Sequence, residues 1–201
     1  MKLFFKIIAY TLHPLLLPTY ATIILVFANP YAFANISGGG LGILKIIFPL
    51  TFMFPVIALF LMKVLNFVDD YYLANQKQRF MPYIAILIFY IWGFLVVRKL
   101  QMPDNMTWMM LGSCIAIALA FTANAFLKIS IHTVGAGCLA AVAIAANASS
   151  YINIQLAMGI VILIAGLVGS CRLYLKAHEQ SEVYAGYMVG FIGMMMAGWL
   201  N

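Results

Sequence analysis

Charged side chains are scarce in this chain, and their scarcity excludes most classes of soluble protein. Only 8% of the 201 residues are Asp, Glu, Lys or Arg, whereas 66% are apolar. Because soluble domains carry about 25% charged residues, this composition indicates a polytopic membrane protein. We expect an all-α fold, a transmembrane helix bundle of about six or seven spans that forms a single integral membrane domain over residues 1–201.

The distribution of charge and the cysteines restrict which partners and cofactors we expect. The formal net charge of +6 comes from scattered Lys and Arg residues without a basic run interleaved with aromatics, so nucleic acid is not expected as a partner. Cys114, Cys138 and Cys171 are odd in number and lie in apolar segments. This placement favours packing roles over a disulfide set or a metal site, and we expect no cofactor.

Apolar stretches, by contrast, are abundant and mark the predicted spans. Since a helix needs about 20 apolar residues to cross the hydrocarbon core, we place spans near 14–34, 42–66, 82–99, 107–127, 132–148, 154–171 and 184–200. Turn-forming residues separate several of them, at 38–40, 103–105 and 147–150. The start, Met1 to Lys6, is followed by no small-residue cleavage site, so we interpret it as a short interfacial helix rather than a signal peptide.

The few polar residues gather in three clusters, which run from Asp69 to Arg79, from Lys128 to His132 and from Arg172 to Glu182. Two predicted spans separate the first cluster from the second, and two more separate the second from the third. An even number of crossings returns the chain to the same side of the membrane. We therefore predict that the three clusters meet at one membrane surface and form one site.

The third cluster carries the strongest chemical signal. Ionisable groups near a bilayer are costly unless they pair or have a function. The planar guanidinium of Arg172 suits bidentate contact with phosphate oxygens. His178 and Glu182 lie one helical turn apart, so the carboxylate can hold one ring nitrogen and leave the other free to attack. The same residues are also typical of an interfacial charged set at the end of a span, with His178 as a bystander.

The other two clusters are less specific by themselves. Ser130 and the backbone amides at a helix start suit an anion, and His132 could supply or remove a proton. A histidine at a span end is also common as a plain interfacial residue. Lys77 and Arg79 resemble an ordinary cationic flank of a span.

Together these segments resemble the type 2 phosphatidic acid phosphatase superfamily of integral membrane lipid phosphatases, over roughly residues 75–200. The third signature of that family is Ser-Arg, five residues, His, three residues and Asp, and Cys171, Arg172, His178 and Glu182 fall at those spacings. The second signature, Pro-Ser-Gly-His, aligns with 129–132, where Ile131 replaces Gly. The first signature, Lys, six residues and Arg-Pro, is degenerate: Arg79 is followed by Pro82, and no Lys stands at the expected offset.

The resemblance implies a metal-independent phosphatase that acts on a phosphorylated membrane lipid. His178 would attack phosphorus and form a phosphohistidine, and Glu182 would orient its ring. His132 would protonate the leaving oxygen and then activate water. The phosphoryl oxygens would be held by four residues, Arg79, Lys128, Ser130 and Arg172, and Lys77 or Lys128 would supply the charge of the missing lysine.

Two other functions are compatible with the same residues. A catalytically impaired relative would bind a phosphorylated lipid or a membrane partner through its cations and would not need the histidines. A small transporter would need polar residues in mid-span, and these are sparse. We expect a multi-pass protein of the bacterial cytoplasmic membrane. Lys2 and Lys6 favour a cytoplasmic site, the family precedent favours the outer face, and the sequence leaves the orientation, the lipid and the oligomeric state open.

Overall fold

The computed structural model describes residues 2–69, 75–150 and 152–200, and within these ranges the chain is helical with no strand. The element order is α1 (Lys2–Thr11), η1 (Pro14–Leu16), α2 (Leu17–Ala28), η2 (Pro30–Phe33), α3 (Gly39–Phe48), η3 (Pro49–Met53), α4 (Phe54–Val64), η4 (Gln76–Arg79), α5 (Phe80–Lys99), α6 (Asp104–Ala123), α7 (Ile131–Ser149), α8 (Gln155–Tyr174) and α9 (Gln180–Leu200). The elements η1, η2 and η4 are 3₁₀ helices, and η3 is a π-helical segment. Positions 70–74 of the first polar cluster lie outside the described residues.

Within the described residues, seven helical segments are long and apolar enough to cross a membrane. This number confirms the predicted all-α, polytopic bundle. The segments are Leu3–Ala28, Gly39–Val64, Gln76–Lys99, Asp104–Ala123, Ile131–Ser149, Gln155–Tyr174 and Gln180–Leu200. The protein is therefore a multi-pass membrane protein, and six of the seven segments fall within a few residues of their predicted positions.

The N-terminal span differs from the prediction, which placed it at 14–34. Helix α2 ends at Ala28, because Asn29 precedes Pro30, and a proline disfavours helical geometry in the residue before it. The Asn29 side chain instead accepts a hydrogen bond from the Ala32 N–H at 3.4 Å and begins η2. At the other end, α1 continues to Thr11, past the short interfacial helix predicted at 1–6, and the chain breaks at His13 and Pro14 before α2 begins. The turn predicted at 147–150 also starts later, since α7 continues to Ser149.

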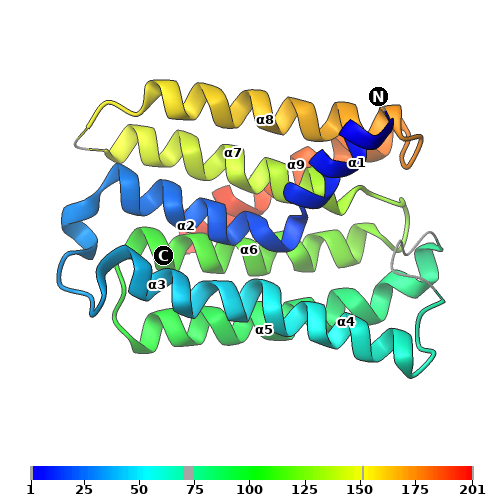
Figure 1. Ribbon diagram of the computed structural model, residues 1–201, viewed down its shortest axis with the longest axis horizontal. Helices are drawn as coiled ribbons and strands as arrows, with labels where there is room; N and C mark the ends of the chain where they lie inside the picture. The colour runs from blue at the N-terminus through cyan, green and yellow to red at the C-terminus, as the bar shows by residue number, and fades with distance from the viewer. Residues whose placement is uncertain (1, 70–74, 151, 201) are drawn as a thin grey trace.

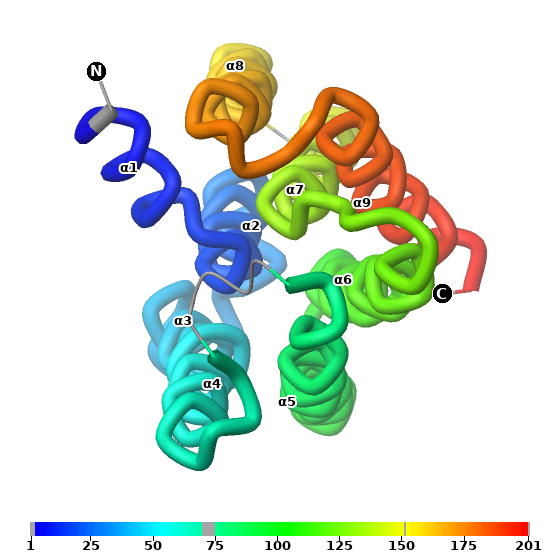
Figure 2. The backbone as a smooth tube through the Cα atoms, turned by 90° about the vertical axis from the view of Figure 1, so that its right-hand side faces the viewer, coloured from blue at the N-terminus to red at the C-terminus, as the bar shows by residue number. Residues whose placement is uncertain are grey.

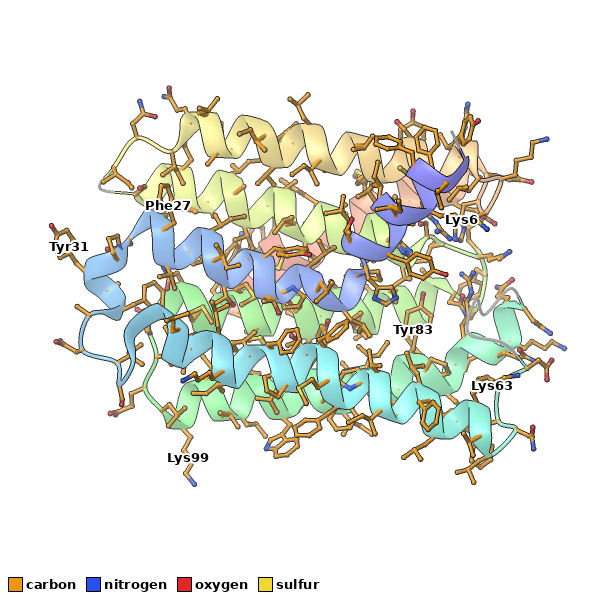
Figure 3. All side chains as sticks on the ribbon, in the orientation of Figure 1. Lys6, Phe27, Tyr31, Lys63, Tyr83 and Lys99 are labelled. Carbon is orange, nitrogen blue, oxygen red and sulfur yellow. The ribbon has the colours of Figure 1, made fainter. Side chains whose placement is uncertain are left out.

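The long helices run side by side, and the loops between them alternate between the two ends of the bundle (Figure 1). Figure 2 looks onto the end that carries α1, the α6–α7 connection and the α8–α9 connection. We call this end the site end. Lys6, Lys63 and Tyr83 lie toward it, whereas Tyr31 and Lys99 lie toward the opposite end (Figure 3). The segments that carry the three polar clusters thus come to one end, as the parity of crossings predicted.

Helices α7 and α9, which carry parts of the second and third clusters, pack with their backbones unusually close. A Cβ atom on Gly190 would lie 1.9 Å from the Val134 carbonyl oxygen, and one on Gly137 would lie 2.4 Å from the Tyr187 carbonyl oxygen. Small residues allow membrane helices to approach each other this closely, and the association of helices in lipid depends on such close packing. The glycines of this interface therefore fix the distance between the two helices that bear the candidate site.

We expect Gly190→Ala to destabilise the bundle by about 1–3 kcal/mol, because the added methyl group overlaps backbone atoms that cannot rotate away. The matched control is Gly166→Ala in α8, where the added methyl group would meet no atom within 4 Å among the described residues. The thermal unfolding midpoint in detergent should fall for Gly190→Ala and stay near wild type for Gly166→Ala. Equal midpoints for the two variants would contradict the close packing of α7 on α9.

Candidate functional site

Hydrogen bonds between segments that are far apart in the sequence join the three clusters. The Arg79 Nη1 donates to the Ile129 carbonyl oxygen at 3.0 Å, which joins the first cluster to the second. The Ser130 backbone N–H donates to the Glu182 carbonyl oxygen at 3.2 Å, which joins the second cluster to the third. The α5–α6 hairpin separates the first two clusters in the sequence. Because its two helices run in opposite directions, it returns the chain to the site end of the bundle.

A cavity of about 110 Å³ lies where these segments meet, at the site end of the bundle. All three histidines of the chain and two arginines line it, which are His13, His132, His178, Arg79 and Arg172. The remaining wall is mostly apolar, and its residues are Pro14, Leu15, Leu59, Pro82, Tyr83, Ile86 and Ile131. Tyr83 marks its position in Figure 3. Among the described residues, the lining includes two permanent cations and no carboxylate.

The turn between α8 and α9 positions His178. Helix α8 ends in a Schellman motif, in which the Ala177 N–H donates to the Arg172 carbonyl at 3.1 Å and the Lys176 N–H donates to the Leu173 carbonyl at 3.0 Å. Lys176 takes the left-handed conformation that this motif requires, with φ 52°. The chain therefore reverses within a few residues of Arg172, and this turn places His178 in the same cavity as the arginine.

Glu182 holds His178 from the first turn of α9. The His178 Nδ1 lies 2.7 Å from the Glu182 Oε2. The same carboxylate oxygen accepts a hydrogen bond from the Glu179 backbone N–H at 3.2 Å, as an acidic residue in the first turn of a helix commonly does. With its Nδ1 proton directed to Glu182, the His178 ring presents an unprotonated Nε2. Only 3% of the His178 side chain is exposed.

Burial lowers the pKa of His178 below its ordinary value of 6.5, although the hydrogen bond to Glu182 acts in the opposite direction. The positive charges of Arg172 and Arg79 also lower this pKa. The neutral ring is therefore the stable form in the unliganded site at pH 7. A neutral imidazole with one oriented nitrogen is a competent nucleophile.

His132 and Arg172, which also line the cavity, differ in their hydrogen bonds. The His132 Nε2 lies 3.3 Å from the Ala9 carbonyl oxygen of α1, so this nitrogen carries the ring proton and Nδ1 is the atom that can exchange one. The Nε of Arg172 is buried and has no hydrogen-bond partner within the described residues. A half-buried guanidinium with no acidic partner among the described residues is suited to an anionic ligand.

Four predicted residues do not line the cavity. One is Glu182, which reaches it only through its hydrogen bond to His178. Ser130 is fully buried, and its Oγ has no hydrogen-bond partner among the described residues. Lys128 is half-buried, and Lys77 is exposed. Ile131, at the position where the second signature has Gly, does line the cavity. The structure thus brings together Arg79, His132, Arg172 and His178, and it leaves both lysines outside the cavity.

Sequence reasoning missed His13. Its ring packs edge-to-face on His132, with 5.5 Å between the ring centroids, and it lines the cavity. The parity of crossings could have found it, because two predicted spans, 14–34 and 42–66, separate His13 from the first cluster. No family signature drew attention to this residue, since the resemblance begins only near residue 75.

Comparisons with models of protein families, with curated proteins and with solved structures give no match. Within the described residues, no three His, Cys, Asp or Glu side chains are grouped as metal ligands. The arrangement offers an oriented, neutral imidazole beside two guanidinium groups in a partly apolar cavity.

Proposed function

We propose that this protein is a metal-independent lipid phosphatase related to the type 2 phosphatidic acid phosphatases, and that His178 is its nucleophile. The observation that carries the proposal is the 2.7 Å pair of His178 and Glu182, with the ring in a cavity that Arg172 and Arg79 also line. Catalysis of phosphoryl transfer depends on positioning and on electrostatic stabilisation of the spreading negative charge. The cavity offers both.

The first step forms a covalent intermediate. The His178 Nε2 attacks phosphorus, the bond from phosphorus to the lipid oxygen breaks, and that oxygen takes a proton from protonated His132. Because the His132 Nε2 is directed at the Ala9 carbonyl, the proton leaves from Nδ1. Glu182 stabilises the positive charge that develops on the His178 ring, as a carboxylate does for a catalytic imidazole.

The second step releases phosphate. His132, now neutral, accepts a proton from water through Nδ1, the water oxygen attacks phosphorus, and the bond from phosphorus to the His178 Nε2 breaks. Arg172 and Arg79 hold phosphoryl oxygens in both steps. Ser130 and Lys128 are close in the sequence to the lining residues Ile131 and His132, and Lys77 is exposed. From outside the lining, the two lysines contribute positive potential and Ser130 contributes a hydroxyl group.

The proposed substrate is a lipid with a terminal phosphate or diphosphate, in the cytoplasmic membrane of a bacterium. Phosphatidate, phosphatidylglycerol phosphate and a polyprenyl diphosphate share this terminal group, and the tail stays in the bilayer. The test is phosphate release by the purified protein in micelles that contain each of these lipids. Rapid acid-free quenching of a radiolabelled substrate should trap an acid-labile phosphoenzyme, and absence of turnover on all three lipids would contradict the proposal.

A second candidate function is supported by Ile131. A β-branched side chain lines the cavity where the family has glycine, and it limits how closely backbone amides can approach a phosphate. The lysine of the first signature is also missing. A relative that binds a phosphorylated lipid through Arg79 and Arg172 without turnover fits these departures, and it would bind phosphatidate but form no phosphoenzyme.

We expect turnover to survive chelation of divalent cations. Two arginines line the cavity, and cations repel a divalent ion while they attract phosphate. Phosphate release should be the same, within about twofold, before and after dialysis against EDTA, because the guanidinium groups supply the charge that a metal supplies in other phosphatases. Loss of activity in EDTA that one divalent ion restores would count against the mechanism.

Replacing Glu182 with Gln tests the role of the carboxylate. Gln can still accept the Glu179 N–H bond at the helix start, so the fold should persist, while the charge that orients and stabilises the His178 ring is lost. We expect kcat to fall by about 10²–10⁴-fold. The Glu182 carboxylate raises the pKa of His178, so any acid limb of kcat/KM that belongs to His178 should move to lower pH in the variant.

The matched control is Glu179→Gln, which removes the same charge from an exposed side chain three residues earlier. It should leave kcat and the pH profile near wild type. An acid limb that moved to higher pH in Glu182→Gln would show that the carboxylate does not stabilise the protonated His178 ring.

A further inference from the structure

We propose that His13 is a substrate-contacting residue, which donates a hydrogen bond from Nε2 to a phosphoryl oxygen held beside Arg172. The inference rests on the proposed function, and it adds a residue of the N-terminal segment, outside the three signatures, to the site. Every histidine of the chain lines the same cavity.

Local backbone geometry fixes the tautomer of His13. The residue stands just before η1, and its Nδ1 accepts a hydrogen bond from the Leu15 backbone N–H at 3.3 Å. Nδ1 therefore carries no proton, and the proton of the neutral ring lies on Nε2. Pro14 follows immediately and has no N–H to offer, so the Leu15 N–H is the first donor of this turn.

The Nε2–H of His13 has no hydrogen-bond partner within the described residues, and His13 itself is half-buried. The other two histidines direct their ring protons to protein acceptors. In the neutral rings the proton of His178 is directed to Glu182 and that of His132 to Ala9, so the second nitrogen of each is unprotonated until it accepts a proton. His13 is thus the histidine that offers a neutral donor, a role that imidazole fills where negative charge develops on a substrate oxygen.

His13 also belongs physically to the site through two contacts. Its ring lies against His132 at 5.5 Å between centroids, and the Ala9 carbonyl that holds His132 belongs to α1, which ends just before His13. Helix α1 in turn packs on α8, the helix of Arg172, with the rings of Phe5 and Tyr174 4.2 Å apart. The N-terminal segment is therefore fixed against two elements of the site.

Two amide substitutions separate the proposed contact from a purely structural role. In His13→Asn the side-chain oxygen can replace Nδ1 and keep the turn at Leu15, as Asn commonly does at helix starts, but nothing replaces the Nε2–H. In His13→Gln the longer side chain can carry an amide N–H near the position of Nε2, while the turn loses its acceptor.

We expect His13→Asn to keep the wild-type unfolding midpoint and to lose about 10²-fold in kcat, as when one donor to a transition-state oxygen is removed. His13→Gln should retain turnover within about tenfold of wild type. Wild-type kcat in His13→Asn, or turnover in His13→Gln that is lower than in His13→Asn, would overturn the assignment and leave His13 a structural cap.

A binding measurement keeps this inference distinct from the proposed function. Vanadate, which mimics the phosphoryl group in transit, is titrated into wild type and His13→Asn, and the nitrogen resonances of ¹⁵N-labelled histidine are followed. The His13 Nε2 resonance should shift on binding, and the variant should bind at least about tenfold more weakly. If the wild type shows no turnover, the phosphatase proposal fails, and weaker vanadate binding by the variant still supports the contact. Equal affinity, or no binding by the wild type, overturns it.

Discussion

His178→Ala is expected to abolish lipid phosphate turnover, with a fall in kcat of about 10⁴–10⁶-fold, as for other enzymes that lose their nucleophile. The reason is geometric. Among the described residues, His178 is the one histidine of the cavity that a carboxylate orients, at 2.7 Å from Glu182, and burial together with two arginines keeps it neutral by lowering its pKa. Among the described residues, alanine leaves in the cavity no imidazole that a carboxylate orients for attack on phosphorus.

Binding of the lipid phosphate should change far less in the same variant. Arg172 and Arg79 remain in the lining, and they supply most of the attraction to the ground state. Affinity for a non-hydrolysable lipid phosphonate in micelles should therefore stay within about threefold of wild type. No acid-labile phosphoenzyme should form. Turnover equal to wild type at matched protein concentration would end the nucleophile assignment, whereas no turnover by the wild type on any phospholipid tried would favour the binding-only relative.

Arg172→Ala should produce the second large effect, with a loss in kcat/KM of about 10³-fold or more, which is the scale for an arginine that stabilises phosphoryl transfer. Unlike His178→Ala, it should raise KM and lower kcat together, because its charge acts on the bound substrate and on the transition state. The buried Nε of Arg172 has no partner among the described residues, so the substitution breaks no internal ion pair that would unfold the protein.

The matched control is Arg98→Ala. Arg98 is exposed near the end of α5, beside Lys99 at the opposite end of the bundle (Figure 3), and it stacks over the Phe94 ring at 5.6 Å. Removing it changes the net charge of the protein by the same amount, so a general electrostatic effect on anionic micelles would appear in both variants. If both lost turnover equally, Arg172 would have no specific part in the site.

The spans and the sidedness of the polar clusters were predictable because lipid places strict demands on a membrane helix. A helix that crosses the hydrocarbon core must satisfy its own backbone and be apolar over about 20 residues, so hydropathy alone locates it. The N-terminal span was misplaced where this rule is weakest, since Asn29 and Pro30 end α2 inside an apolar stretch.

The sequence by itself determined the class of fold, the positions of six of the seven spans and the gathering of the three polar clusters at one end, because each follows from hydropathy and the parity of crossings. It also placed His178 and Glu182 one turn apart, a local relation that helical geometry preserves. Only the tertiary structure decided that His13 joins the site, that Lys77 and Lys128 lie outside the cavity, and that Ala9 fixes the proton of His132. These contacts join segments far apart in the chain, and their distances depend on how the helices pack. For example, a Cβ atom on Gly135 of α7 would lie 2.3 Å from the Leu17 side chain of α2.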